Sequence, residues 1–373
     1  MYVSNREYLT FDDVLLVPSK SLPSRETPVL DSLIHCMKDD AERWIRIYTK
    51  HPIVPANMDT ICGKEMAIEI VKSGGIAIIH RFMSYENRLD AYNEAMKFAQ
   101  LGKIHPSVDI LEPSDLRTAY VGFAVVSIGC SKEEVFIAKK LIDAGVMALC
   151  IDVANGYSDA VSDAIFELRN YQSNRPLWII AGNIATVEGF QFLVDAGADT
   201  VKIGIGPGSH CTTRLVTGCG VPQLSAIMDI AKYKLENNVP ATIIGDGGVK
   251  NSGDILKALV AGADLVMSGS LFAGCKETPG EIVDGMKVYR GMASKDAQVD
   301  WRKTDPDKIV PEGESSLVPY KGTYNNQLQL LVGGIKSGMS YLNTETIHNL
   351  THVQFIKVST NTLIENKPHG KRS

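Results

Sequence analysis

The segment Asp195-Ala196-Gly197-Ala198-Asp199-Thr200-Val201-Lys202-Ile203-Gly204 contains the end of one predicted helix and the whole of one predicted strand. A glycine is typical of the position after a helix, where φ is positive, and the β-branched run that follows is typical of a buried strand. The same order of glycine and apolar run returns at 73–80, 143–152 and 261–269. Repeated units of this kind predict a parallel sheet with helical crossovers.

Four more apolar runs lie between these units and bring the predicted strands to eight. In chain order the strands cover residues 52–58, 76–80, 123–129, 146–152, 178–183, 199–204, 242–246 and 264–269. Residues 133–144, 187–195 and 253–260 carry the apolar spacing of helices. The expected fold class is therefore α/β, with residues 1–373 forming a single (β/α)8 TIM barrel domain. A doubly wound open sheet is the alternative.

Composition and charge exclude several classes of protein. The 373 residues are 45% hydrophobic and 22% charged, which is enough for a packed core and excludes wholesale disorder. A net charge of −5 leaves no basic excess for phosphates, so we expect no nucleic-acid partner. We also expect no membrane association and a cytoplasmic location, because no run reaches eighteen apolar residues and the start lacks the apolar region of a secretory signal. Seven cysteines without a CxxC pair support neither a zinc site nor a disulfide framework.

Polar residues follow the predicted strands at their carboxyl ends, where the active sites of barrels lie. They are Asn57, Asp59, His80, Arg81, Asp152, Asn155, Asn183, Asp246-Gly247-Gly248 and Ser268-Gly269-Ser270. Asp246 could hold ribose hydroxyls, and the glycines of the last two loops could let backbone amides reach phosphate, with Tyr289 and Met292 closing the same pocket. The alternatives are tight turns without a ligand and, for Asp152, a helix cap.

The loop after the sixth predicted strand is Gly204-Ile205-Gly206-Pro207-Gly208-Ser209-His210-Cys211-Thr212-Thr213-Arg214. Its glycines and proline make a rigid turn whose amides could bind an anion or whose carbonyls could hold a monovalent cation. Cys211 is flanked by hydroxyls and Arg214, and such surroundings favour a usable thiolate nucleophile. The alternative is a small buried cysteine, which is our interpretation of the other six.

This loop resembles that of the IMP dehydrogenase/GMP reductase family. The resemblance extends to Asp246-Gly247-Gly248, Leu9-Thr10-Phe11-Asp12-Asp13-Val14-Leu15-Leu16-Val17-Pro18, Ala56-Asn57-Met58-Asp59-Thr60 and Val318-Pro319-Tyr320-Lys321-Gly322. It implies a (β/α)8 barrel that is usually a homotetramer. It also implies attack by the loop cysteine on C2 of a purine nucleotide, GMP or IMP, with hydride exchanged with a nicotinamide cofactor.

The resemblance assigns roles to individual residues. Cys211 would be the nucleophile, with Thr213 and Glu312 as a proton-transfer pair. The nucleotide would be held by Ser209, Asp246, Gly247, Gly248, Gly269, Ser270, Gly291, Met292, Ala293 and Gly313. The cofactor would be held by Ser24, Arg25, Arg81, Asp152, Val153, Ala154, Ile205, Gly206 and Ser337. A potassium ion would be held by Gly206, Gly208, Cys211 and Arg214.

Two features favour the GMP reductase branch, which uses NADPH to convert GMP into IMP and ammonia. Dehydrogenases usually insert a pair of CBS modules after the second strand, and this chain has no room for a CBS insertion there. The polar segment 293–318 resembles a mobile flap, and its residues 294–311 contain Arg302 but not the Arg-Tyr pair of dehydrogenases, whose arginine activates water. Pro222-Gln223-Leu224-Ser225-Ala226 also resembles reductases.

Other features resemble bacterial dehydrogenases. They are Ile309-Val310-Pro311-Glu312-Gly313, Tyr289-Arg290-Gly291-Met292 and Asn366-Lys367-Pro368-His369. Reductases often have an arginine in place of Ile309. The last motif lies in a tail, 366–373, that we expect to be flexible. His210 is atypical of both branches. The alternatives are thus an IMP dehydrogenase without CBS domains, which would use NAD⁺ to make XMP, and an inactive purine-nucleotide-binding protein.

Overall fold

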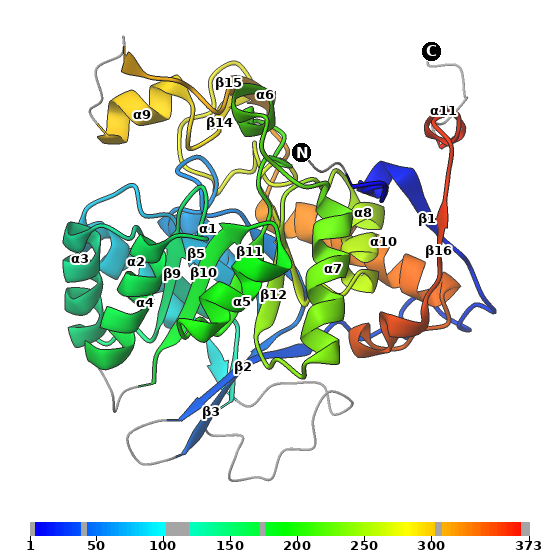
Figure 1. The fold of residues 1–373 in the computed structure, drawn as a ribbon, viewed down its shortest axis with the longest axis horizontal. Coiled ribbons are helices and arrows are strands. Elements are labelled where there is room, and N and C mark those ends of the chain that lie inside the picture. The colour runs from blue at the N-terminus through cyan, green and yellow to red at the C-terminus, as the bar shows by residue number, and fades with distance from the viewer. Residues whose placement is uncertain (1–3, 39–42, 102–118, 172–175, 303–307, 367–373) are drawn as a thin grey trace.

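The computed structural model describes residues 4–38, 43–101, 119–171, 176–302 and 308–366. Eight parallel strands form one sheet in the order β4-β13-β12-β11-β10-β9-β8-β5, and β4 lies beside β5, so the sheet is nearly closed as a barrel (Figure 1). The predicted (β/α)8 barrel is confirmed, and the open-sheet alternative is wrong. Each predicted strand overlaps one of β4 Ile53–Pro55, β5 Ile76–Ile79, β8 Phe123–Ile128, β9 Ala148–Asp152, β10 Trp178–Ile184, β11 Thr200–Ile203, β12 Thr242–Asp246 and β13 Leu265–Ser268.

Helices cover the outer side of the barrel (Figure 1). They are α1 Lys64–Lys72, α2 Tyr85–Met96, α3 Lys132–Asp143, α4 Asp159–Tyr171, α5 Val187–Asp195, α7 Gln223–Glu236, α8 Ser252–Val260 and α10 Tyr324–Tyr341. The glycines after α3 and α5, Gly145 and Gly197, have φ of 96° and 109°, as the sequence pattern predicts. Among the described residues, no helix is long and apolar enough to cross a bilayer.

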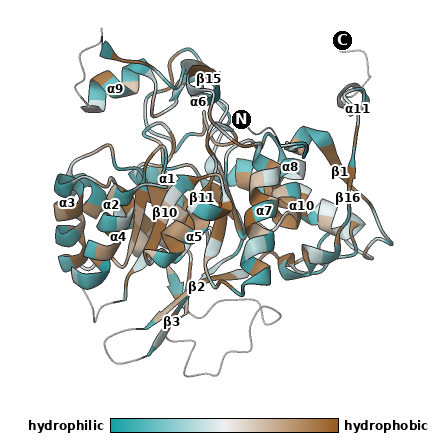
Figure 2. Cartoon of the chain, in the orientation of Figure 1, coloured by the Kyte–Doolittle hydropathy of each residue, from teal (hydrophilic) through white to brown (hydrophobic). Residues whose placement is uncertain are grey.

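The strands are apolar on both faces because the barrel interior and the helix layer each bury one of them. Ile78 and Trp178 point into the interior cluster, whereas Ile79 and Ile179 pack under the helices. Figure 2 shows this as hydrophobic strands behind helices whose outer faces are hydrophilic. The amino end of the barrel is closed by β2 Ser32–Lys38 and β3 Trp44–Thr49, where His35 stacks on Trp178 with ring centroids 5.3 Å apart.

Short elements complete the fold. β6 Gln100–Leu101 and β7 Ala119–Val121 join β2 and β3 in one sheet, and β1 Val14–Leu16 pairs with β16 Phe355–Lys357. The 3₁₀ helices η1 Phe11–Asp13 and η4 Ile347–His352 and the helix α11 Thr362–Glu365 flank this pair in the chain. Residues 367–373 of the predicted tail lie outside the described residues.

The segment predicted as a polar flap contains regular structure, which the sequence analysis missed. β14 Met286–Arg290 pairs with β15 Ser315–Pro319, and α9 Lys295–Arg302 lies between them above the carboxyl ends of the strands (Figure 1). α9 can be polar because only a few of its residues contact the rest of the protein. Ala297 is buried, and Trp301 lies against Phe82 with ring centroids 6.1 Å apart. The side chain of Arg302 lies outside the described residues.

Three histidines, of which His51 and His80 are buried and His35 is half-buried, predict that the fold loses stability on mild acidification. Burial lowers the pKa of His35, His51 and His80 to about 4. Between pH 6.5 and 4 the unfolded chain therefore binds more protons than the folded chain, so stability falls as the pH falls through this window, by about 1.4 kcal/mol per pH unit for each histidine. Urea unfolding at pH 7 and pH 5 measures the slope. His51→Gln should lower this slope by the equivalent of about one bound proton. A free energy of unfolding that does not change with pH in this window would contradict the account.

Candidate functional site

A cavity of about 610 Å³ opens at the carboxyl ends of the barrel strands, a size typical of small-molecule sites. Its walls come from strand ends all round the barrel, from the loop after β11 and from the segment that follows β14. The predicted site residues that line it are Arg81, Asp152, Val153, Ala154, Ile205, Gly206, Gly208, Ser209, Cys211, Thr213, Arg214, Asp246, Gly247, Gly248, Gly269, Ser270, Gly291, Met292, Ala293 and Glu312. The structure therefore brings most of the predicted residues into one place.

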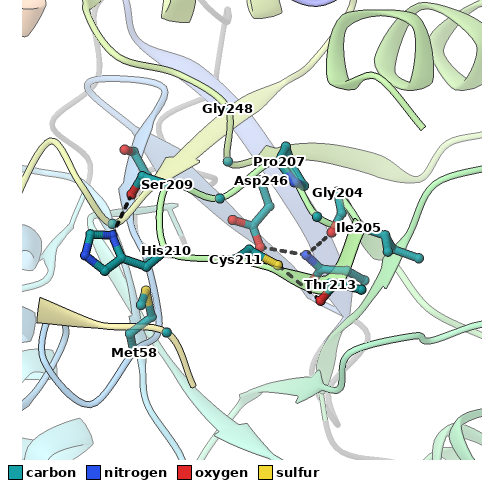
Figure 3. Close-up of a pocket in the computed structure, with 18 of the residues that line it drawn as sticks. Met58, Gly204, Ile205, Pro207, Ser209, His210, Cys211, Thr213, Asp246 and Gly248 are labelled. Carbon is teal, nitrogen blue, oxygen red and sulfur yellow. Dashed lines mark hydrogen bonds between the residues drawn. The ribbon is translucent and has the colours of Figure 1, made fainter. Parts of the chain in front are cut away.

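The loop after β11 holds Cys211 beside a hydroxyl. The Cys211 thiol donates to Thr213 Oγ1 at 3.2 Å, as the dashed line in Figure 3 marks. The turn that leads to them requires glycine at Gly206, where φ is +83° and a Cβ atom would lie 2.4 Å from Cγ of Arg214. The Arg214 guanidinium in turn donates to the carbonyls of Ile205 and Val221, so this arginine holds the loop together.

The backbone of the cysteine loop is clasped by the segment that carries Glu312. The amide of Thr212 donates to the Glu312 carbonyl at 2.9 Å, and the amide of Glu314 donates to the His210 carbonyl at 2.9 Å. Gly313, a predicted nucleotide contact, pairs directly with Cys211 in this bridge and does not itself line the cavity among the described residues. Glu312 and Thr213 both line the cavity.

His210, the residue atypical of both family branches, connects the cysteine loop to the hairpin of β14 and β15. Its Nε2 lies 2.6 Å from Ser316 Oγ, and its ring lies against Tyr289 with centroids 4.3 Å apart. Burial lowers the pKa of His210, so the ring is neutral at pH 7. The Tyr289 hydroxyl also lies 3.3 Å from Ser209 Oγ. These contacts join the hairpin to the predicted nucleotide side of the cavity.

Removing the His210–Ser316 hydrogen bond from either side should loosen the hairpin to the same extent. His210→Phe keeps an aromatic ring against Tyr289, and Ser316→Ala removes the other partner. Each variant should raise amide hydrogen exchange in β15 about tenfold, the equivalent of one hydrogen bond, and the double variant should be no worse. Ser315→Ala is the matched control. Additive effects of the two substitutions would show that the side chains do not act through each other.

The floor of the cavity contains a buried charge that the sequence analysis did not single out. Lys202 of β11 is 2% exposed, and its Nζ donates to Asp152 Oδ1 at 2.8 Å and to Asp246 Oδ2 and Asn57 Oδ1 at 3.3 Å each. Burial lowers the pKa of Lys202, but the two carboxylates outweigh it, so its net pKa is raised. The available signal was one charge within the otherwise uncharged run Thr200-Val201-Lys202-Ile203.

Asp152 is part of this floor, so its interpretation as a helix cap is wrong. The following helix, α4, begins at Asp159, seven residues later. Burial raises the pKa of Asp152, but Lys202 and Arg81 lower it by more, and the carboxyl is ionised at neutral pH. Both Asp152 and Asp246 line the cavity. The floor is therefore a buried ammonium between two carboxylates that face the ligand space.

Asp59, which the sequence analysis placed with the polar strand ends, anchors the flap helix. It accepts from Arg290 Nη2 at 2.6 Å and from Trp301 Nε1 at 2.7 Å. Arg290 also pairs with Asp300 at 2.7 Å. The sequence analysis missed Trp301, because nothing in a polar segment marks one aromatic residue as the contact to a distant strand end.

The predicted cofactor residues fall into two groups. Arg81, Asp152, Val153 and Ala154 lie together in the cavity, and Arg81 Nε is buried without a hydrogen-bond partner among the described residues, so a ligand acceptor would fit there. Ser24, Arg25 and Ser337 do not line the cavity. Arg25 instead lies beside Tyr341, with 3.3 Å between Nη2 and the hydroxyl. Within the described residues of one chain, the two groups of predicted cofactor residues do not line the same cavity.

The predicted potassium site would be built from backbone carbonyls. The described residues contain no group of three or more His, Cys, Asp or Glu side chains that could hold a metal ion, so side chains offer no competing site there. The Gly208 carbonyl accepts the Cys211 amide at 3.1 Å, and the Arg214 carbonyl accepts the Gly218 amide at 3.1 Å. Arg214 carries a positive guanidinium, so among the four predicted ligands it is the one whose side chain opposes a cation. The cation site remains a prediction.

Known proteins resemble the whole chain. The family model described as "IMP dehydrogenase / GMP reductase domain" matches residues 8–369. An inosine-5′-monophosphate dehydrogenase from Borreliella burgdorferi is 38% identical over 409 aligned positions, covering 98% of this chain and 97% of that protein. A GMP reductase from Leishmania donovani is 32% identical over 487 positions, with 97% of each covered. A crystal structure of a cysteine-to-alanine GMP reductase from Trypanosoma brucei, in complex with guanosine 5′-monophosphate, matches with a TM-score of 0.82 at 28% identity over 99% of both chains.

Proposed function

The chain belongs to the IMP dehydrogenase/GMP reductase family of nicotinamide-dependent oxidoreductases, and from this premise we propose that it is a GMP reductase. The proposed reaction converts GMP and NADPH into IMP, ammonia and NADP⁺. One observation carries the proposal: the Cys211 thiol donates to the Thr213 hydroxyl in a cavity that Glu312 also lines, whereas residues 294–311 lack the Arg-Tyr pair that would activate water. Such a site supports loss of ammonia better than hydrolysis.

The mechanism begins with attack of Cys211 sulfur on C2 of the guanine ring. The C2–S bond forms and the bond from C2 to the exocyclic nitrogen breaks, so ammonia leaves. Ammonia departs as a neutral molecule only when its nitrogen has gained a proton, and Thr213 linked to Glu312 would deliver it. The adduct then needs a hydride at C2, which a nicotinamide cofactor would supply when bound beside Arg81, Asp152, Val153 and Ala154. Cleavage of the C2–S bond releases IMP and restores the thiolate.

The described residues fit a nucleotide at one end of the cavity. Asp246 Oδ2 is held by Lys202 and by Asn183 Nδ2 at 2.8 Å, while Oδ1 makes no hydrogen bond among the described residues and is available to ribose hydroxyls. Ser209, Gly248, Gly269 and Ser270 would surround the phosphate. The GMP bound to the Trypanosoma brucei reductase supports a purine nucleotide as the ligand class.

We extend the proposal to the finer properties of the family. Residues 1–373 would act as one catalytic domain in which 293–318 is the flap. Carbonyls of Gly206, Gly208 and Cys211 would hold a potassium ion, and the enzyme would be a cytoplasmic homotetramer. Ser24, Arg25 and Ser337 would take part in cofactor binding only in such an assembly, because they do not line the cavity of their own chain.

An IMP dehydrogenase is the second candidate, and two observations favour it. The Borreliella burgdorferi dehydrogenase is more similar to this chain than the Leishmania donovani reductase is, at 38% against 32% identity. This chain has 373 residues, and its alignment with that dehydrogenase spans 409 positions. Its alignment with the reductase is longer, at 487 positions. Chain length therefore does not separate the two branches. The choice depends on the flap and its missing Arg-Tyr pair.

Two parallel assays test the proposal. NADPH absorbance is followed after addition of GMP, and XMP formation is followed after addition of IMP and NAD⁺. We expect NADPH consumption that releases one ammonia per IMP formed, and no XMP. XMP as the main product would contradict the proposal and establish the dehydrogenase. Tight binding of GMP with no turnover in either assay would establish an inactive nucleotide-binding protein.

A further inference from the structure

We propose that Lys202 is a positioning residue that links the cofactor-side carboxylate of Asp152 to the nucleotide-side carboxylate of Asp246. The inference builds on the proposed function, because that function assigns the two carboxylates to two different ligands. Lys202 lies in the cavity lining, but its Nζ donates to three protein oxygens, so it would act on the ligands through the two carboxylates. One buried ammonium would instead set the orientation of both binding groups.

The geometry places the ammonium between residues from three parts of the barrel. Its partners are Asp152 at the end of β9, Asp246 at the end of β12 and Asn57 in the segment after β4. An ammonium has three N–H donors, and these three oxygens can take all of them. Asn57 is itself fixed, because its Nδ2 donates to Ser127 Oγ at 3.1 Å. The ammonium is therefore held at one point by groups that do not depend on a ligand.

The partners of Lys202 distinguish this role from a purely structural one. A lysine that only completes the core would pair with groups that are themselves in the core, and Lys287 of β14 is such a case. Lys287 is also 2% exposed, but its Nζ donates to backbone carbonyls, including those of Cys275 at 3.2 Å and Lys276 at 3.3 Å. Lys202 instead pairs with two carboxylates that line the ligand cavity.

Electrostatics makes the two carboxylates interdependent. Two anions that share one site repel, and their proximity alone favours protonation of one of them. The ammonium between them offsets this repulsion, and each carboxylate draws it away from the other. A change in charge at Asp152 should therefore alter how strongly Lys202 holds Asp246 Oδ2, and the reverse. Binding at the two ends of the cavity is expected to be coupled through this cation.

The test compares Lys202→Met with Lys287→Met in the full chain, measuring kcat and the KM for GMP and NADPH separately. Lys202→Met should raise both KM values about tenfold or more, the effect of one charge-assisted hydrogen bond at each ligand. The rate of Cys211 alkylation by iodoacetamide should be unchanged. Lys287→Met should alter thermal stability while both KM values stay within about twofold. KM values for Lys202→Met within about threefold of the parent would overturn the proposal.

A double-mutant cycle tests the coupling itself and does not require Lys202→Met to fold. Asp246→Asn should weaken GMP binding, and Asp152→Asn should weaken NADPH binding. Because Lys202 remains shared, Asp152→Asn should also change the KM for GMP by about threefold, and the two substitutions should be non-additive. Additivity, with each effect confined to one ligand, would overturn the proposal. If the parent uses IMP and NAD⁺, the proposed function fails, and the same comparisons with those ligands still test Lys202.

Discussion

Replacing Cys211 with alanine should reduce turnover of GMP by about 10⁴-fold or more while leaving GMP binding within a few-fold of the parent. The sulfur is the atom that bonds to C2 in the proposed mechanism, and no other described side chain in the cavity is a cysteine. The nucleotide contacts assigned to Asp246 and Ser209 do not involve the thiol. Calorimetric titration with GMP and initial rates of NADPH oxidation measure the two properties.

Cys219 provides the matched control for this experiment. It follows the short helix α6 Thr213–Thr217, is exposed, and its thiol donates to the carbonyl of Thr217. Cys219→Ala should leave both rate and binding unchanged. Turnover by Cys211→Ala above about 1% of the parent rate would contradict covalent catalysis. Loss of GMP binding in that variant would instead show that the thiol shapes the site.

Replacing Glu312 with glutamine should slow the overall reaction by about 10²-fold, within the range for a lost general acid–base group. Deamination should suffer more than hydride transfer, because only the departing ammonia requires the proton that Thr213 and Glu312 deliver. A kinetic isotope effect with deuterated NADPH separates the steps. In Glu312→Gln this effect should fall towards unity, since deamination becomes rate-limiting.

Glu314→Gln is the control for the Glu312 substitution. Glu314 lies two residues further along the same segment and is exposed, and its side chain does not line the cavity among the described residues. Its isotope effect and rate should match those of the parent. An unchanged isotope effect in Glu312→Gln, with the rate reduced, would mean that both steps were slowed equally and would remove the assigned role of Glu312.

The barrel and most of the candidate site could be predicted because their signals are local in the sequence. A glycine followed by a short apolar run marks four of the eight strands, and in a barrel the residues after every strand meet at one end. The presence of Asp246 and Cys211 in one cavity follows from that topology. Their separation in the chain is no obstacle, because both follow neighbouring strands, β11 and β12.

The remainder depends on contacts that no local pattern records. Lysine side chains are mostly exposed in folded proteins. Lys202 is nevertheless buried, with Asp152, Asp246 and Asn57 around its ammonium. The helix α9 forms in a polar segment because Trp301 donates to Asp59, a residue more than two hundred positions away in the sequence. Both depend on pairing between distant residues, and a single sequence does not state which partners meet.

The fate of two labelled atoms tests the central claim, that reductive loss of ammonia occurs at C2 of GMP. GMP carrying ¹⁵N on its exocyclic nitrogen is incubated with NADPH that carries deuterium at the transferred position of the nicotinamide. The account predicts IMP with deuterium at C2 and one equivalent of ¹⁵N-ammonia per IMP. Release of ¹⁵N-ammonia with XMP and no deuterium in the purine would contradict it, as would IMP whose C2 hydrogen comes from water.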